Sequence, residues 1–167
     1  MGALVAFEMA REIRRRCGLS PVHLFVSGHA APQIRRRRAP VHQLSDDVFV
    51  EAIRQLNGTP EQVLENAELM ALVLPALRAD LALCETYTYL STAPLDCPTS
   101  AFGGLADSEV RYDDLRAWQA ETTGPFRLRL FPGDHFYLRD ERTALLDAIS
   151  QTIRQSIDQP ARLQVEV

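Results

Sequence analysis

The sequence has little cysteine, no lysine and no long apolar run. Its cysteines are scattered and form no CxxC pair, which argues against zinc and favours a reducing cytoplasm in which they serve as small core residues; they are Cys17, Cys84 and Cys97. No apolar run approaches the roughly 20 residues of a membrane span, and no signal-peptide pattern begins the chain. We therefore expect a soluble, cytoplasmic protein that does not bind a membrane.

Excess charge of one sign is also missing. The formal net charge is −4, from 18 basic and 22 acidic residues, which excludes a general nucleic-acid binder because such proteins need a basic surface. Every basic residue is arginine, a composition that identifies no partner. What the chain does contain is 46% apolar residues among 167, enough for one globular domain with its own core.

The N-terminal segment has helical periodicity as far as Cys17, and Gly18 ends it. An apolar ridge with a four-residue repeat runs beside a row of small residues that would permit close packing; the ridge is Val5, Met9, Ile13 and Cys17, and the row is Gly2, Ala6 and Ala10. Neither an N-cap residue nor a strand precedes this helix, so we expect the chain to begin partway through its fold. Residues 22–27 then predict a short buried strand.

A loop and a helical block are predicted next. Residues 30–45 carry prolines and a run of four arginines, Arg35 to Arg38, a pattern typical of a solvated loop. The block that follows is rich in leucine and shows no strand pattern.

Two helices are expected in that block. Ser45 is placed to cap a helix over 46–56, and Thr59 begins a capping-box pattern for a helix that reaches about residue 89. Pro75 predicts either a kink in the second helix or its division into two shorter ones.

The last third of the sequence changes rhythm. Strand, helix, strand and helix patterns follow one another over residues 97–102, 113–122, 126–131 and 140–157. Because this alternation is typical of parallel pairing, we predict an α/β fold with a mainly parallel sheet and flanking helices. No repeat is present, and the tail after Pro160 is too short for another domain.

Two polar residues follow predicted strands in a way that suggests chemistry. Asp107 comes just after the strand that ends near Gly104, and His135 comes just after the strand that ends at Phe131. In a parallel sheet both loops emerge at the same carboxyl edge, so the carboxylate and the imidazole could meet there. Such a pair serves as acid and general base in acyl transfer. Asp134 adjoins His135 and is the poorer orienting group.

Each candidate also has an ordinary structural interpretation. An aspartate in a glycine-rich turn often bonds to nearby backbone N–H groups, as Asp107 could. A nucleophile is missing, because Ser27 ends a strand that leads into a loop instead of a sharp strand-to-helix turn. The remaining histidines, His23, His29 and His42, have no metal-ligand spacing and are expected to be structural or solvated.

Three segments resemble the type II thioesterases, which are stand-alone editing hydrolases of nonribosomal peptide and polyketide synthesis. The first, Met1-Gly2-Ala3-Leu4-Val5-Ala6, is similar to the segment after the nucleophile in an α/β-hydrolase elbow. The others are Pro98 to Asp107 (PTSAFGGLAD), with Trp118 beyond it, and Phe131 to Leu138 (FPGDHFYL). The resemblance extends from the first helix to the last.

The resemblance implies a set of site residues. Asp107 would be the triad acid and His135 the triad base, and neither a metal nor another cofactor would be needed. The triad serine would directly precede Met1, whose backbone amide would be an oxyanion donor in the longer chain. The chain, residues 1–167, would then be a single partial α/β-hydrolase domain with a helical lid inserted at about 40–90.

The implied activity is hydrolysis of acyl thioesters on the phosphopantetheine arm of an acyl or peptidyl carrier protein. Without the serine, the 167-residue chain is expected to be inactive alone. Arg35 to Arg38 could meet an acidic carrier protein, although a solvated loop is the ordinary interpretation. Two alternatives stay open: a fragment of an integrated chain-releasing thioesterase domain, or a non-catalytic fragment that binds carrier proteins. His29 stands where the family usually has arginine, so no role is assigned to it.

Overall fold

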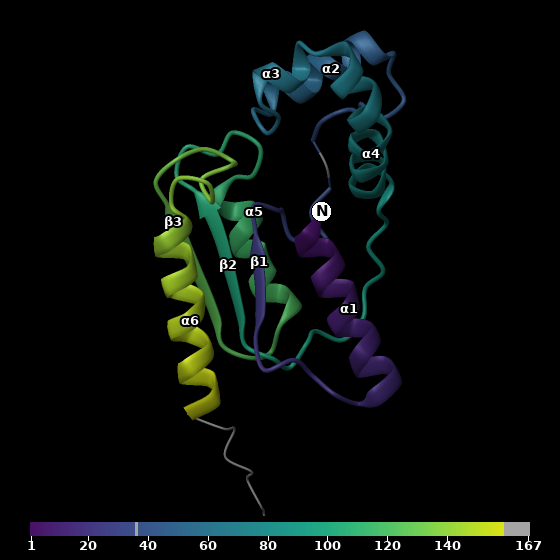
Figure 1. Cartoon of the computed structure of the whole chain (residues 1–167). Coiled ribbons are helices and arrows are strands. Elements are labelled where there is room, and N and C mark those ends of the chain that lie inside the picture. The colour runs from purple at the N-terminus through teal and green to yellow at the C-terminus, as the bar shows by residue number, and fades with distance from the viewer. Residues whose placement is uncertain (36, 159–167) are drawn as a thin grey trace, which may run out of the picture. The chain divides into compact units, whose positions relative to one another are not determined.

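A computed structural model describes residues 1–35 and 37–158, so Arg36 and the tail after Pro160 lie outside the described residues. The elements in chain order are α1 (Gly2–Cys17), β1 (Leu24–Ser27), α2 (Asp46–Gln55), α3 (Glu61–Leu64), α4 (Ala67–Thr86), β2 (Thr99–Gly104), α5 (Tyr112–Arg116), the 3-10 helix η1 (Ala117–Glu121), β3 (Phe126–Phe131) and α6 (Arg142–Asp158) (Figure 1). The predicted α/β class is confirmed.

The sheet has the order β1-β2-β3, and both strand pairs are parallel, as predicted. Thr99 at the start of β2 is in register with Leu24 of β1 and with Phe126 of β3. All six residues of β2 are buried, as expected for a central strand covered on both faces. The carboxyl ends of the three strands therefore share one edge of the sheet.

Helices cover both faces of the sheet. Neighbouring residues of a strand point to opposite faces, so Phe102 and Gly103 mark the two sides of β2. On one side Phe102 packs with Phe131 and Ala148, which brings in α6. On the other side a Cβ atom at Gly103 would collide with Leu115 of α5, so glycine allows this close approach.

Helix α1 packs through a different face from the one that its strongest repeat indicates. Its buried residues are Ala3, Leu4, Phe7 and Ala10, and the Phe7 ring meets Trp118 edge-on at 5.4 Å. The ridge is exposed, with Val5 at 41% and Met9 at 58%. Cys17 is exposed as well, so its assignment to the core is wrong, whereas Cys97 is buried. The buried face of α1 is therefore the one that carries Leu4 and Phe7.

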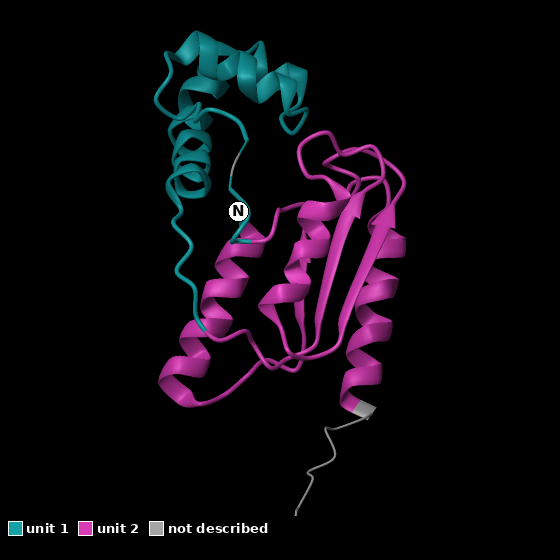
Figure 2. Ribbon diagram, turned by 180° about the vertical axis from the view of Figure 1, so that it is seen from behind, with its two compact units in different colours: residues 1, 32–92 teal, residues 2–31, 93–167 magenta. Residues whose placement is uncertain are grey.

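The chain divides into two compact units, shown in teal and magenta in Figure 2. Unit 1 contains residues 1 and 32–92, and its core is built on Phe49, Ile53, Leu64 and Met70. Unit 2 contains residues 2–31 and 93–167, including the sheet. The single domain over 1–167 and the lid at about 40–90 stay predictions.

The helix boundaries in unit 1 differ from the predicted ones. Ser45 precedes α2, but its side chain makes no capping hydrogen bond. The Thr59 capping box does not form either, because Pro60 takes the N-cap position of the one-turn helix α3. Instead, Asn66 starts α4 and accepts a hydrogen bond from Leu69 N at 3.0 Å.

Pro75 lies inside α4, which runs undivided from Ala67 to Thr86, so of the two predicted outcomes the division at this proline does not occur, and the kink stays a prediction. Proline removes one backbone hydrogen bond from a helix. Val73, Leu74 and Leu77 on either side of it pack against the core of unit 1, and this apolar contact helps to hold the helix together.

Two elements of unit 2 are shifted or altered relative to the prediction. Strand β2 begins at Thr99, two residues later than expected, because Pro98 has no N–H with which to join a ladder. The predicted helix over 113–122 is instead α5 followed by the 3-10 helix η1. Among the residues that the structure describes, no helix is long and apolar enough to cross a membrane.

Candidate active site

The loops after β2 and β3 bring together the two residues predicted from the sequence. Nδ1 of His135 lies 2.9 Å from Oδ2 of Asp107. The Asp107 side chain is fully buried, whereas the His135 side chain is 28% exposed. The pair therefore consists of a shielded carboxylate and an imidazole that solvent can reach.

Both oxygens of Asp107 are engaged. Oδ1 accepts hydrogen bonds from the backbone N–H groups of Glu109 at 2.8 Å and Val110 at 3.1 Å, while Oδ2 faces His135. Asp107 thus both accepts hydrogen bonds from backbone N–H groups of its turn and pairs with His135. Burial by itself would raise the pKa of Asp107, but the His135 hydrogen bond and charge and the two backbone N–H groups outweigh it and lower the pKa below its ordinary value.

The Asp107 contact determines what His135 can do. An ionised carboxylate only accepts hydrogen bonds, so the proton of neutral His135 belongs on Nδ1 and the lone pair on Nε2. That tautomer is the one that a general base needs. Asp134 is engaged elsewhere, since its Oδ1 accepts a hydrogen bond from Phe136 N at 2.8 Å.

Gly104 allows the His135 loop to approach the sheet. A Cβ atom at Gly104, the last residue of β2, would collide with the backbone oxygens of Gly133 and Asp134. Gly28 follows β1 with φ of +58°, and a Cβ atom there would lie 3.5 Å from Cε1 of His135. The imidazole therefore lies beside the end of β1 as well as beside Asp107.

Sequence analysis missed a second polar contact in this region. The hydroxyl groups of Ser27 and Tyr137 are 2.6 Å apart. Tyr137 is completely buried and stacks on Phe131, with ring centroids 5.4 Å apart. Burial raises the pKa of Tyr137 above its ordinary value. A tyrosine two residues after a candidate base was the available signal for this contact.

The start of α1 lies near the same edge. Helix α1 packs against β1 and runs in the opposite direction, so Gly2 lies toward the carboxyl end of β1 (Figure 1). Met1 directly precedes the helix and is 45% exposed. Its role as an oxyanion donor stays a prediction.

The other histidines make structural contacts. Nε2 of His23 lies 2.9 Å from the Ser100 hydroxyl, and Nδ1 of His42 lies 2.6 Å from Glu85. His29 contributes its backbone oxygen, which accepts a hydrogen bond from the Trp118 indole N–H at 2.8 Å. Over residues 1–35 and 37–158, no three His, Cys, Asp or Glu side chains gather as metal ligands would.

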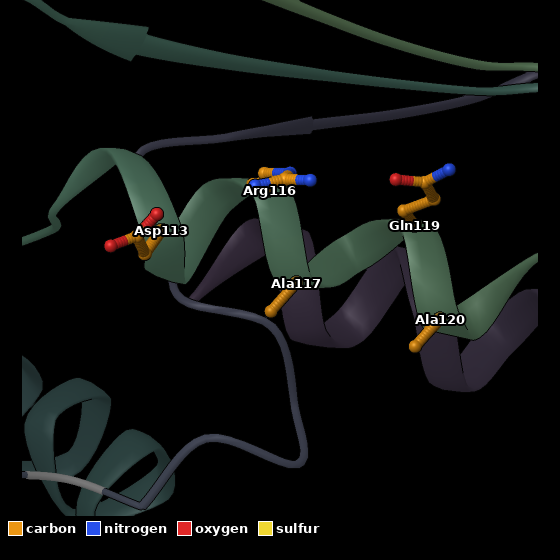
Figure 3. A pocket seen from close by; sticks show the side chains of 5 residues that line it. All are labelled: Asp113, Arg116, Ala117, Gln119 and Ala120. Atoms are coloured by element: carbon orange, nitrogen blue, oxygen red, sulfur yellow. The ribbon is translucent and has the colours of Figure 1, made fainter.

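A surface pocket of about 420 Å³ lies elsewhere, on α5 and η1 (Figure 3). Its lining is Asp113, Arg116, Ala117, Gln119 and Ala120. Neither Asp107 nor His135 contributes to it, and it offers no paired acid and base. We therefore place the candidate active site at Asp107 and His135, on the evidence of their hydrogen bond.

Known proteins resemble this chain along most of its length. The family model described as "Thioesterase domain" matches residues 1–153. The gramicidin S biosynthesis protein GrsT of Aneurinibacillus migulanus is 45% identical over 92% of this chain and 60% of its own. The chain thus spans about three fifths of the length of that relative.

Solved structures give the same result. BorB, the type II thioesterase from the borrelidin biosynthetic cluster, is 42% identical with a TM-score of 0.80, over 89% of this chain and 60% of its own. The RedJ thioesterase of the prodiginine pathway in Streptomyces coelicolor is 44% identical with a TM-score of 0.77, over 86% of this chain and 55% of its own.

Proposed function

Because this chain belongs to the thioesterase domain family, we propose that it carries the acid and the base of an enzyme that hydrolyses acyl thioesters. The predicted resemblance to type II thioesterases is confirmed, because the similar structure BorB is a type II thioesterase. The observation that carries the proposal is the hydrogen bond between Asp107 and His135, on two loops at one edge of a parallel sheet.

The proposed reaction begins with His135. Its Nε2 removes the proton of a serine hydroxyl while the serine oxygen attacks the thioester carbonyl carbon. Asp107 holds the imidazole in the required tautomer and stabilises the imidazolium that forms. The carbon–sulfur bond then breaks, and the His135 imidazolium gives its proton to the sulfur, so that a thiol leaves and His135 is neutral again. His135 next removes a proton from water, which attacks the acyl-enzyme, and it returns that proton to the serine oxygen as the acid is released. The proposed serine directly precedes Met1 and lies outside the given sequence.

Two further groups complete the proposal. In a chain with a residue before Met1, the backbone N–H of Met1 would donate to the oxyanion that forms at the attacked carbonyl. Helices α2 to α4 would form a lid over the acyl group, and their apolar side chains would line its channel. The reaction as written uses no metal and no redox cofactor.

The proposed substrate is an acyl group on the phosphopantetheine arm of an acyl or peptidyl carrier protein, in the cytoplasm. GrsT and BorB are both named for biosynthetic systems, which supports this choice. Arg35, Arg37 and Arg38 are exposed and are candidates for contact with an acidic carrier. Arg36 belongs to the same predicted run but lies outside the described part of the chain.

The test measures acid release from an acyl-carrier protein by the 167-residue chain and by a chain extended upstream through Gly-His-Ser. We expect turnover only from the extended chain. Turnover by the shorter chain would contradict the proposed position of the nucleophile. Carrier-protein binding by both chains without hydrolysis would favour the non-catalytic alternative.

In the extended chain, Asp107→Asn is expected to lower kcat by about 10³–10⁴, because an amide in place of the carboxylate favours the wrong imidazole tautomer. His135→Ala should lower kcat at least as much. The matched control is Asp113→Asn, the same chemical change at an exposed position in α5. Equal activity in Asp107→Asn and in this control would rule out Asp107 as the acid.

A further inference from the structure

A second hydrogen bond joins the His135 loop to the sheet, at the end of β1. The Tyr137 hydroxyl and the Ser27 hydroxyl are 2.6 Å apart, although 109 residues separate them in the sequence. Tyr137 lies two residues after His135, and Ser27 is the last residue of β1. The contact therefore connects the loop after β3 with the far strand of the sheet.

The core fixes the position of the Tyr137 ring. The ring is completely buried and stacks on Phe131 at an interplanar angle of 9°. Phe131 in turn packs edge-on against Phe102, with centroids 5.9 Å apart. The Tyr137 backbone N–H donates to Asp134 O at 3.1 Å, which closes the turn around His135. Tyr137 is thus a rigid point in the loop.

The end of β1 links the position of Tyr137 to that of the His135 imidazole. Its neighbour Gly28 faces the His135 ring, so consecutive residues of one strand end meet Tyr137 and His135 respectively. The imidazole therefore lies close to Gly28 as well as being hydrogen-bonded to Asp107. A shift of the loop relative to β1 would move the ring and alter its hydrogen bond to Asp107.

We propose that Tyr137 is a positioning residue for His135 and that its hydrogen bond to Ser27 holds the imidazole in line with Asp107. The inference rests on the proposed function, because His135 matters as a base only in that reaction. Tyr137 touches neither substrate nor reacting atoms in this scheme. It acts by fixing the loop, and displacements on the order of 1 Å in catalytic geometry can lower rates about 10²-fold.

The test uses four variants: Tyr137→Phe, Ser27→Ala, their combination, and Ser27→Thr, which keeps a hydroxyl. Tyr112→Phe is the matched control, because it removes the same hydroxyl from a tyrosine that is 55% exposed. The first readout is the NMR signal of the His135 Nδ1 proton in the 167-residue chain, assigned by its loss in His135→Ala. The second is kcat and KM for thioester hydrolysis in the extended chain. Thermal unfolding is followed in parallel.

We expect Tyr137→Phe and Ser27→Ala each to lower kcat about tenfold with little change in KM, and to broaden the Nδ1 proton signal through faster exchange with solvent. The combined variant should be no worse than either single one, because both remove the same bond. Ser27→Thr should restore the signal. Tyr112→Phe should change neither readout.

An unchanged Nδ1 signal in both single variants would overturn the inference, as would effects on kcat that multiply in the combined variant. Ser27→Ala leaves the Tyr137 ring stack in place, so it decides the question if Tyr137→Phe unfolds. The NMR measurement needs no turnover. A chain that hydrolyses no thioester would therefore contradict the proposed function while the positioning inference is still tested.

Discussion

His23 connects three elements through one imidazole ring. It lies just before β1, its Nε2 meets the Ser100 hydroxyl of β2 at 2.9 Å, and its Nδ1 meets the Ser156 hydroxyl of α6 at 3.3 Å. The ring also stacks on Phe25, with centroids 4.4 Å apart. Burial lowers the pKa of His23 below its ordinary value, and the nearby Arg127 charge adds to the effect.

This pKa shift predicts a loss of stability in mild acid. In the unfolded chain His23 takes up a proton near pH 6.5, but in the folded chain it does so only at lower pH. Stability should therefore be constant above about pH 7.5, fall as the pH drops through about 6.5, and level off below the folded pKa. Urea unfolding at pH 7.5 and 5.5 measures the change.

His23→Gln is the comparison for this prediction, because an amide can donate and accept hydrogen bonds without titrating. Its stability should change less between the two pH values than that of the parent chain. An equal or larger decline in His23→Gln would show that other groups control the acid sensitivity.

The pairing of Asp107 with His135 was predictable from the sequence because it follows from topology. Both residues come directly after parallel strands, and such loops share an edge whatever the details of packing. The contact between Ser27 and Tyr137 was not predictable, because it depends on how far one loop reaches across the sheet. The need for glycine at position 104 was not predictable either, since only the folded loop shows that a Cβ atom there would collide with the backbone of Gly133 and Asp134.

Among the elements, the helix starts in unit 1 show that a favourable residue type at the N-cap position does not by itself produce a capping hydrogen bond. Ser45 and Asn66 both occupy N-cap positions, yet only the Asn66 side chain makes a capping hydrogen bond. The residue type permits a cap, but the local backbone decides whether the side chain reaches the free N–H groups. This is why the predicted cap at Ser45 was wrong and the cap at Asn66 was missed.

The two caps predict different responses to the same kind of change. Asn66→Ala should destabilise the protein by about 1 kcal/mol, because Leu69 N loses its hydrogen-bond partner at the start of α4. Ser45→Ala should change the free energy of unfolding by much less. Urea unfolding of both variants provides the measurement, and a larger effect at Ser45 would contradict this assignment of the caps.

The strands and the first and last helices were predicted to within two residues at either end, because their apolar patterns are repeated along the segment. β3 matches its prediction residue for residue, and α1 and α6 do so within two residues at either end. The helix predicted from Thr59 is the clearest failure, because α3 ends at Leu64 and a separate helix starts after Asn66.

At the scale of the whole molecule, unit 1 has a polar centre of its own beside its apolar core. The Glu85 side chain is fully buried and accepts hydrogen bonds from Val41 N, His42 N and His42 Nδ1, the last at 2.6 Å. Arg78 donates to Leu44 O at 2.9 Å and lies over the Phe49 ring. These contacts bind residues 41–44 to α4.

Glu85→Gln should loosen unit 1 while leaving the sheet intact. The neutral amide oxygen is a weaker acceptor than the carboxylate, and the NH₂ group that replaces one carboxylate oxygen cannot accept from Val41 N or His42 N, so these two amides should exchange hydrogen faster with solvent. Exchange in β2 should not change, because separate compact units open separately. Native-state hydrogen exchange followed by NMR tests both statements.

The control for this change is Glu51→Gln, in which the same substitution is made on a carboxylate that is 54% exposed in α2. It should leave the exchange of Val41 and His42 amides unaltered. Faster exchange throughout β2 in Glu85→Gln would contradict the independence of the two units.

The pairing of β1 with β2 has a consequence for how the molecule acquires its structure. Leu24 pairs with Thr99, and all of α2, α3 and α4 lies between them in the chain. Closing so long a loop carries an entropic penalty before any hydrogen bond between β1 and β2 forms. The helices, whose contacts are local, can therefore form earlier than the sheet. On the ribosome, the pairing of β1 with β2 must wait until the chain has been synthesised past Gly104. Helix α1, which packs against β1, is complete well before that point.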